Sequence, residues 1–293
     1  MPGMTTSNNQ ANMAENFTQA ASVVPASQWR RLVSCISERR LPVRLKQIGP
    51  EILSKLSGQS VVFCRGGRKK FLKFKVEAES MSDLILHEVF TSRVYFPTID
   101  KRTEFKINRN DLVIDIGANV GLFAACAANQ TRGKVYCFEP NGSNFAALER
   151  HRKINKLDNM LLINKGISDR DESTKLYLHG NNCGAHSVFS AKGDGLEFDE
   201  GRYEEIECIS LKQAFDEYDI NRCDFLKIDC EGAEGKILTA LPSDYFKRIT
   251  RIALEYHANV SVLELAELLD ENGFSVFIKG YPEKWGLLFA IRR

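Results

Sequence analysis

The sequence predicts an α/β fold whose sheet has seven strands, mostly parallel, and ends in an antiparallel hairpin. After residue 110, apolar runs of strand length alternate with helical stretches, which is typical of βαβ units on a parallel sheet. The first five runs are nearly continuous in Val, Ile, Leu and Phe, as strands covered on both faces require. A turn-rich connection joins the last two runs, so we expect them to pair antiparallel. In order, the runs are LVIDI, KVYCF, MLLIN, DFLKID, ITRIALE, FSVFI and LLFAIRR.

Ahead of this sheet the sequence divides into a tail and a smaller segment. Residues 1–25 are rich in Ser, Asn, Gln and Ala without a sustained apolar period, so we expect a disordered tail. Residues 26–110 are predicted to form an N-terminal segment, with two helices over 28–56 and a β-hairpin over 60–76. We attribute the basic run of this hairpin to a solvated face, with an anionic substrate as the alternative. Residues 111–293 form the predicted main domain.

Composition limits the class of protein and the kind of partner. The net charge of +2 over 293 residues lacks the basic excess that a protein binding duplex nucleic acid usually carries. The eight cysteines include no Cys-x-x-Cys pair and are interpreted as reduced core thiols. No secretory leader and no apolar stretch of membrane-spanning length is apparent, so a cytoplasmic protein is expected. We therefore expect a small-molecule or carbohydrate substrate, no nucleic acid and no membrane span, and a homo-oligomer is compatible with the sequence.

The first apolar run leads into a tight glycine turn and then a helix. Asp115 lies in the run, and Gly117 and Gly121 follow it, with Asn119 between them. Glycines let the backbone approach a ligand, and a helix N-terminus offers unpaired N–H groups. The spacing does not fit the dinucleotide pattern G-x-G-x-x-G. Asn tolerates positive φ, so Asn119 is expected to replace a turn glycine, and its amide is placed to hold the amino-acid end of a cofactor.

An acidic residue ends the second run about 20 residues beyond the glycine turn. Glu139 is followed by Pro140 and Asn141, and a carboxylate at this place accepts hydrogen bonds from the ribose hydroxyls of an adenosine. The alternative is that Glu139 only caps the following helix. After the third run, the segment 166–169, which includes Ser168, lies where an adenine ring would rest. Residues 172–210 then break the strand–helix rhythm and are predicted to be an insertion over the carboxyl edge of the sheet.

Carboxylates gather at the ends of the fourth and fifth runs. Asp229 and Glu231 follow the fourth, and Glu255 and His257 end the fifth, so all four should share one crevice of a parallel sheet. Crowded carboxylates are costly unless they pair with Lys227, a cation or a substrate. We expect catalysis here, with Asp229, Glu231 and His257 as the candidate catalytic residues. The alternatives are that Glu231 caps the next helix and that His257 is structural.

The motifs DIGANVGLF, FEPN, ISD, LKIDCEGAE and LEYH, in this order over residues 85–293, resemble the FkbM family of S-adenosylmethionine-dependent methyltransferases. The resemblance implies the class I methyltransferase fold, which is Rossmann-like, and O-methylation of sugars or secondary metabolites. It also implies that Asp229 and Glu231 line the reaction site. The cofactor-binding positions that we expect are Asp115, Gly117, Asn119, Gly121, Glu139, Asn141 and Ser168.

Two questions stay open at this point. An alcohol needs activation, either by a base such as His257 or Asp229 or by a divalent cation held by Asp229, Glu231 and Glu255, and we favour the metal-free version. The rival functions are a nicotinamide-dependent oxidoreductase and a non-catalytic nucleotide-binding protein with the same fold. The glycine spacing and the acidic fourth strand oppose the first rival. Polar groups at three strand ends oppose the second.

Overall fold

The computed structural model describes residues 52–56, 59–63, 67–69, 71–75, 81–101, 103–178, 186–188, 202–257, 260–280 and 285–293. The predicted tail and most of the predicted N-terminal helices lie outside these ranges. None of the described helices is long and apolar enough to cross a bilayer.

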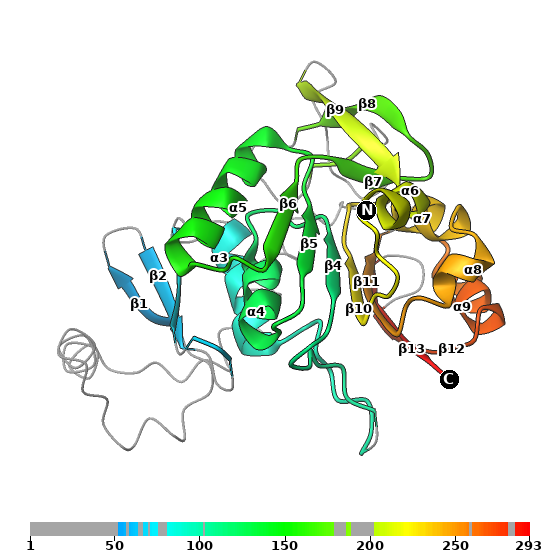
Figure 1. Ribbon diagram of the computed structural model, residues 1–293, viewed down its shortest axis with the longest axis horizontal. Coiled ribbons are helices and arrows are strands. Elements are labelled where there is room, and N and C mark those ends of the chain that lie inside the picture. The colour runs from blue at the N-terminus through cyan, green and yellow to red at the C-terminus, as the bar shows by residue number, and fades with distance from the viewer. Residues whose placement is uncertain are drawn as a thin grey trace, which may run out of the picture. The chain divides into compact units, whose positions relative to one another are not determined.

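The seven predicted strands form one sheet, as expected (Figure 1). Its order is β12-β13-β11-β10-β4-β5-β6. The pairs among β11, β10, β4, β5 and β6 are parallel, whereas β13 runs antiparallel to both β11 and β12. The strands are β4 (Val113–Ile116), β5 (Val135–Phe138), β6 (Met160–Ile163), β10 (Phe225–Ile228), β11 (Arg251–Tyr256), β12 (Phe274–Gly280) and β13 (Gly286–Arg292).

Both faces of this sheet are buried, which explains the continuous apolar runs. Along β4, Val113 belongs to one hydrophobic cluster and Ile114 and Ile116 belong to another, because successive strand residues point to opposite faces. The first cluster includes residues of α4 and α5, and the second includes residues of the later helices. The helices are α4 (Leu122–Gln130), α5 (Gly142–Asn155), α6 (Leu211–Glu217), α7 (Glu234–Thr239), α8 (Ser243–Phe246) and α9 (Val262–Glu271).

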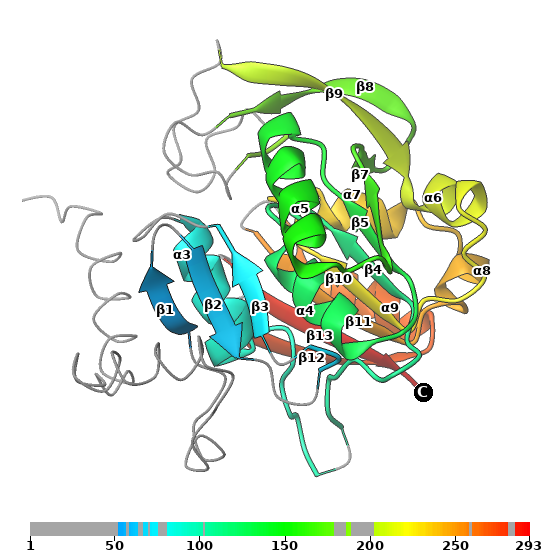
Figure 2. The same cartoon turned by 60° about the vertical axis from the view of Figure 1, so that its left-hand side comes forward.

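The insertion after the third strand forms a second, small sheet at one end of the first (Figure 2). Its order is β7-β9-β8, with β7 at Gly166–Ser168, β8 at Glu172–Tyr177 and β9 at Tyr203–Ser210. Buried residues of β8 and β9 line the pocket described below. The insertion therefore covers the carboxyl edge of the main sheet, as predicted.

Ahead of the main sheet, β2 (Gln59–Phe63) and β3 (Phe71–Phe74) pair antiparallel, which confirms the predicted hairpin. The prediction of a helix up to residue 56 is wrong at its end, because β1 (Ile52–Leu56) is a strand paired with β2. Pairing with the hairpin edge outweighs the weak helical period of this short stretch. A short α-helix, α3 (Met81–His87), and a π-helical turn, η2 (Glu88–Ser92), follow.

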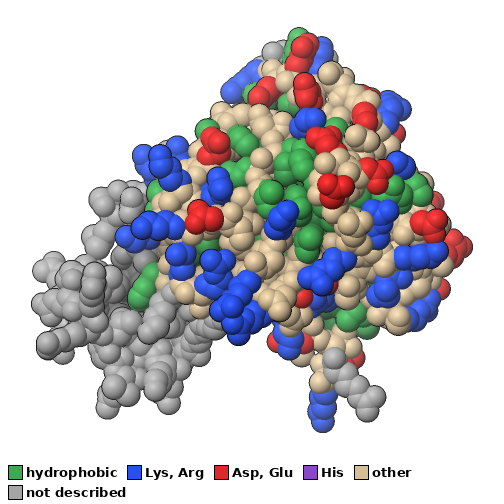
Figure 3. Space-filling model, in the orientation of Figure 1, with side chains coloured by type: hydrophobic (Ala, Val, Ile, Leu, Met, Phe, Trp, Pro, Cys, Tyr) green, Lys and Arg blue, Asp and Glu red, His purple; other side chains and the backbone are tan. Residues whose placement is uncertain are grey.

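The described surface carries charges of both signs. On the face drawn in Figure 3, Lys and Arg side chains are interspersed with Asp and Glu, in keeping with the small net charge. The five described cysteines are free thiols, and four of them are buried, as the sequence predicted.

Candidate functional site

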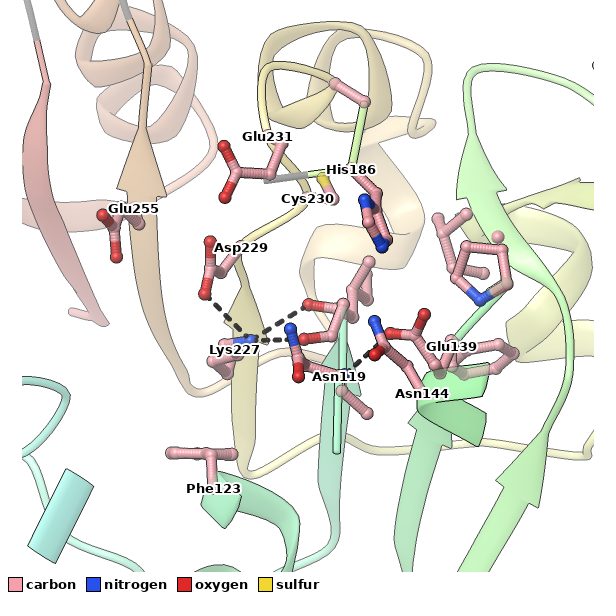
Figure 4. A pocket seen from close by; sticks show the side chains of 18 of the residues that line it. Asn119, Phe123, Glu139, Asn144, His186, Lys227, Asp229, Cys230, Glu231 and Glu255 are labelled. Atoms are coloured by element: carbon pink, nitrogen blue, oxygen red, sulfur yellow. Dashed lines mark hydrogen bonds and ion pairs between the residues drawn. The ribbon is translucent and has the colours of Figure 1, made fainter. Parts of the chain in front are cut away.

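A cavity of about 300 Å³ lies at the carboxyl ends of β4, β5, β10 and β11 (Figure 4). This is the switch point of the sheet, since the chain proceeds from β4 to β5 on one side and β10 pairs with the other side of β4. Two groups of polar side chains face it. Asn119, Glu139 and Asn144 lie at one end, and Lys227, Asp229, Glu231 and Glu255 lie at the other.

The glycine turn has the backbone that its sequence predicted. Gly117, Asn119 and Gly121 have φ values of 73°, 51° and 86°, so Asn119 does take the place of a turn glycine. The N–H groups of Gly117 and Ala118 donate to the Phe138 carbonyl, at 3.1 and 2.9 Å. A side chain on Gly117 would overlap the carbonyl oxygen of Asp229. The glycine therefore lets the turn approach the end of β10 closely.

Glu139 is buried at the cofactor end of the cavity, with 5% of its surface exposed. Its Oε2 accepts the Asn119 N–H at 2.7 Å, and its Oε1 accepts the Asn141 N–H at 2.9 Å. Burial raises the pKa of Glu139 to about 7, and the two backbone hydrogen bonds offset only part of this effect. The Asn144 side chain also hydrogen-bonds Glu139. The two carboxylate oxygens together offer four lone pairs, so these three partners leave one for a ligand hydroxyl.

Four of the predicted cofactor residues lie outside the cavity lining. Asp115 is fully buried behind the cavity, 3.2 Å from Lys227 Nζ. Gly121 begins α4 and packs against α5. Asn141 caps α5, since its side chain accepts the Asn144 N–H, and Ser168 donates to the neighbouring Asp169. Gly166 and Ile167, from the segment predicted to contact the adenine, do line the cavity, as does Asn144.

Lys227 is the buried cation that the carboxylates of the fourth strand required. Its Nζ lies 3.2 Å from Asp115 Oδ1 and 3.3 Å from Asp229 Oδ2, and it donates to the Gly117 carbonyl at 2.8 Å. Burial alone would raise the pKa of Asp229, but Lys227 and His257 outweigh it and hold that pKa below its usual value. Asp229 is therefore ionised, and Lys227 ties it to the glycine turn.

The segment before the sheet also contributes to the cavity lining, and the sequence did not predict its two polar residues there, Glu88 and Tyr95. Tyr95 Oη donates to Asp229 Oδ2 at 2.9 Å and lies 3.3 Å from Glu255 Oε2. Burial, with the charge of Asp229, raises the pKa of Glu88 to about 7 and that of Glu255 to about 8. No motif or strand end marks Tyr95 or Glu88, so their role depends on tertiary packing that spacing does not reveal.

Both ring nitrogens of His257, a candidate base, lie beside carboxylates. Its Nδ1 lies 3.2 Å from Oε1 of the buried Glu234, and its Nε2 lies 3.3 Å from Glu231 Oε2. Burial lowers the pKa of His257, but the hydrogen bond to Glu234 and the charges of Glu234, Glu231 and Asp229 raise it to about 10. The ring is then an imidazolium at neutral pH, without a lone pair to accept a proton.

Asp229, Glu231 and His257 also form a set of candidate metal ligands, with one atom from each residue within 4.8 Å of the others. His257 takes the place that the sequence analysis gave to Glu255. A cation there would require the ring to lose its proton and its ion pairs.

Comparison with known proteins identifies the family. The sequence model described as "Methyltransferase FkbM domain" matches residues 115–276, more than half of the chain. The chain belongs to the FkbM methyltransferase family. It is therefore a methyltransferase, which excludes the oxidoreductase alternative.

The individual relatives have low sequence identity to this chain, but the matches cover most of its length. The chain is 26% identical to the 31-O-demethyl-FK506 methyltransferase FkbM of Streptomyces tacrolimicus, over 69% of this chain and 85% of that protein. It is 22% identical to methyltransferase sdnD of Sordaria araneosa, over 75% of this chain and 92% of that protein. Among solved structures, the methyltransferase FkbM of Methylobacillus flagellatus matches with a TM-score of 0.41 and 15% identity, over 64% of this chain and 44% of that one.

Proposed function

We propose that this member of the FkbM family transfers the methyl group of S-adenosylmethionine to a hydroxyl oxygen of a small-molecule or carbohydrate acceptor. One observation carries the proposal: a single cavity holds Glu139 at one end and an ionised Asp229 at the other. Glu139 is suited to bind the ribose of an adenosine, and Asp229 is suited to accept a hydrogen bond from a hydroxyl group.

The residues of the cofactor end fit the adenosine and amino-acid parts of S-adenosylmethionine. Glu139 lines the cavity and, beside its hydrogen bonds to Asn119, Asn141 and Asn144, keeps acceptor capacity for a ribose hydroxyl. The turn from Gly117 to Gly121 brings backbone close to the ligand, and Gly166 and Ile167 provide a wall for the adenine. When bound, S-adenosylmethionine supplies a methyl carbon that is already electrophilic, so the protein must mainly align the acceptor.

Asp229 is proposed to align the acceptor and to take its proton. The acceptor oxygen forms the new bond to the methyl carbon, the electrons of the carbon–sulfur bond stay on sulfur, and the hydroxyl proton passes to Asp229. A weak base is sufficient, because the oxygen becomes strongly acidic as the methyl group is transferred. His257, as an imidazolium, balances the charge of Glu231 and Asp229 and takes no proton.

The nature of the acceptor follows from the same end of the cavity. Glu88, Asp229, Glu231 and Glu255 line it, Asp229 is ionised, and Lys227 is already paired with Asp115 and Asp229. This end therefore favours a neutral hydroxyl donor over an anionic acceptor such as a nucleic-acid phosphate. The Streptomyces relative is named for a 31-O-demethyl substrate, which supports oxygen as the acceptor atom.

A methyl-transfer screen tests this function. Methyl glycosides, inositols and hydroxylated macrolides would be supplied with S-adenosylmethionine, and release of S-adenosylhomocysteine would be measured. We expect Asp229→Asn to reduce turnover by roughly 10²-fold or more while cofactor affinity stays within a few-fold. Asp244→Asn, at an exposed carboxylate outside the cavity lining, is the matched control and should match the wild type. Equal turnover in Asp229→Asn would place the chemistry elsewhere.

Chelation in the same assay separates the two modes of activation. The metal-free mechanism predicts that turnover survives EDTA. If EDTA abolishes turnover and Mn²⁺ or Mg²⁺ restores it, Asp229, Glu231 and His257 are the ligands to substitute next.

A further inference from the structure

Tyr95 reaches the reaction end of the cavity from outside the part of the chain that the family sequence model matches. It follows η2 in the chain, 20 residues before the matched region begins at Asp115. Its side chain is 5% exposed and lines the cavity beside the ends of β10 and β11. The residue is therefore part of the site, although no motif of the methyltransferase domain includes it.

Packing fixes where the hydroxyl of Tyr95 lies. The ring packs edge-on against Phe123, with 5.4 Å between centroids, and Lys227 Nζ lies 5.6 Å from the Tyr95 centroid. The ring is thus held from two sides by residues of the main domain. Burial, with the charges of Asp229 and Glu255, raises the pKa of Tyr95 well above its ordinary value, so the hydroxyl keeps its proton and remains a donor.

Both donors to Asp229 meet at the same oxygen. Tyr95 Oη lies 2.9 Å from Oδ2, and Lys227 Nζ lies 3.3 Å from the same atom. Among the described residues, Asp229 Oδ1 has no such donor. The two contacts on one oxygen restrict rotation of the carboxylate and leave the other oxygen for a hydroxyl.

We propose that Tyr95 is a positioning residue for methyl transfer, whose hydroxyl holds Asp229 so that Oδ1 receives the acceptor hydroxyl. The proposal rests on the proposed function for its chemistry. It assigns part of the reaction site to the segment that precedes the family domain. Substitutions near Tyr95 would then change acceptor use without changing cofactor binding.

Tyr95→Phe removes only the hydroxyl and keeps the ring against Phe123. With the best acceptor from the methyl-transfer screen, we expect kcat to fall about tenfold or more, the scale of one hydrogen bond to a charged group. The dissociation constant of S-adenosylmethionine should stay within about twofold. Tyr245→Phe is the matched control, because Tyr245 Oη also donates to a carboxylate, Asp216 Oδ1 at 2.7 Å, but lies outside the cavity lining.

A double variant distinguishes positioning from a general structural role. If Tyr95 acts through Asp229, adding Tyr95→Phe to Asp229→Asn should change the residual turnover by less than about twofold. If Tyr95 only supports the fold, Tyr95→Phe should reduce turnover by the same factor in the wild type and in Asp229→Asn. An equal loss in both backgrounds, or wild-type kcat in Tyr95→Phe, would overturn the proposal.

A second readout needs no acceptor. In protein labelled with ¹³C at the aspartate carboxyl carbons, the signal absent from Asp229→Asn reports Asp229, which faces Lys227, Asp115, Glu88, Glu231, Glu255 and His257. Loss of the Tyr95 donor should move its titration to higher pH by about one unit, and Tyr245→Phe should not move it. An unchanged titration would contradict the contact. This result can be read even if S-adenosylmethionine does not bind, so failure of the proposed function and failure of this inference are distinguishable.

Discussion

Glu139 is a buried carboxylate and Asp229 a half-buried one, and their neighbours shift their pKa values in opposite directions. Glu139 accepts hydrogen bonds from backbone N–H groups, which lower its pKa, but burial outweighs them and raises the pKa to about 7. Asp229 has Lys227 at 3.3 Å, and that ammonium helps hold its pKa below the usual value. The protein thus contains one carboxylate that titrates near neutrality at the cofactor end and one that stays ionised at the reaction end.

Cofactor affinity should depend on pH through Glu139. Because its pKa is raised to about 7, the carboxyl is mostly neutral below that pH and ionised above it. Ribose hydroxyls donate to the ionised form, so S-adenosylmethionine affinity should fall as pH drops below 7, by up to about tenfold per pH unit. Calorimetry from pH 5.5 to 8.5 measures this slope. In Glu139→Gln, the part of this pH dependence that comes from Glu139 should vanish. If the slope is unchanged, the pH dependence of the affinity belongs to Glu88 or Glu255.

Single residues also show what could be predicted from the sequence. Glu139, Asp229 and Glu231 were found because each follows an apolar strand, and strand ends meet at one edge of a parallel sheet. The protonation state of His257 was not predictable, because it depends on Glu234, whose side chain turns inward and is fully buried.

At the scale of elements, the glycine turn works by contact with a neighbouring strand. From the sequence, the glycines of this turn were expected to let the backbone approach a ligand. The structure gives a further reason for the glycine at Gly117, since an added carbon would overlap the Asp229 carbonyl oxygen at the end of β10. The turn therefore sets the distance between the cofactor end and the reaction end.

Gly117→Ala should destabilise the fold by about 2 kcal/mol or more, from the positive φ and the displaced strand end. Gly235→Ala is the matched control. It lies in α7, where an added carbon meets Val260 Cγ1 at an ordinary 3.5 Å, so stability should stay equal or rise slightly. Urea denaturation of both variants checks this. Equal stability of Gly117→Ala and the wild type would show that the end of β10 can move to make room for the added carbon.

At the start of α5, Asn141 acts as a helix cap. Its side chain accepts the Asn144 N–H and donates to Glu204 Oε2 at 2.7 Å, whereas its backbone N–H supports Glu139. The FEPN motif could not separate these roles, because a strand end and a helix start coincide there.

Asn141→Ala should cost about 1 kcal/mol of stability, the usual value of a lost N-cap, and should leave S-adenosylmethionine affinity within about twofold. Ser210→Ala removes the corresponding cap of α6, where Ser210 Oγ accepts the Gln213 N–H at 3.1 Å. The two variants should lose similar stability. A loss of cofactor affinity confined to Asn141→Ala would make Asn141 a ligand after all.

At the scale of the whole molecule, the sheet was predictable and the completion of the site was not. Strand type and the closing antiparallel pair follow from apolar runs and their connections, which are local features. The contributions of Tyr95 and Glu88, and of the insertion strands β8 and β9, come from segments packed over the sheet edge. Such packing depends on contacts between residues distant in sequence, such as the hydrogen bond from Tyr95 to Asp229, 134 residues apart.

Calorimetric titration of S-adenosylmethionine tests whether Glu139 binds the cofactor. Three proteins are compared: the wild type, Glu139→Gln and Glu149→Gln, which alters an exposed carboxylate of α5. At pH 8 the wild type and Glu149→Gln should bind the cofactor equally. Glu139→Gln should bind about tenfold or more weakly, because the buried site loses the charged acceptor of the ribose hydroxyls. Equal affinity in all three proteins would remove Glu139 from the cofactor site, and no binding by the wild type would contradict the central claim.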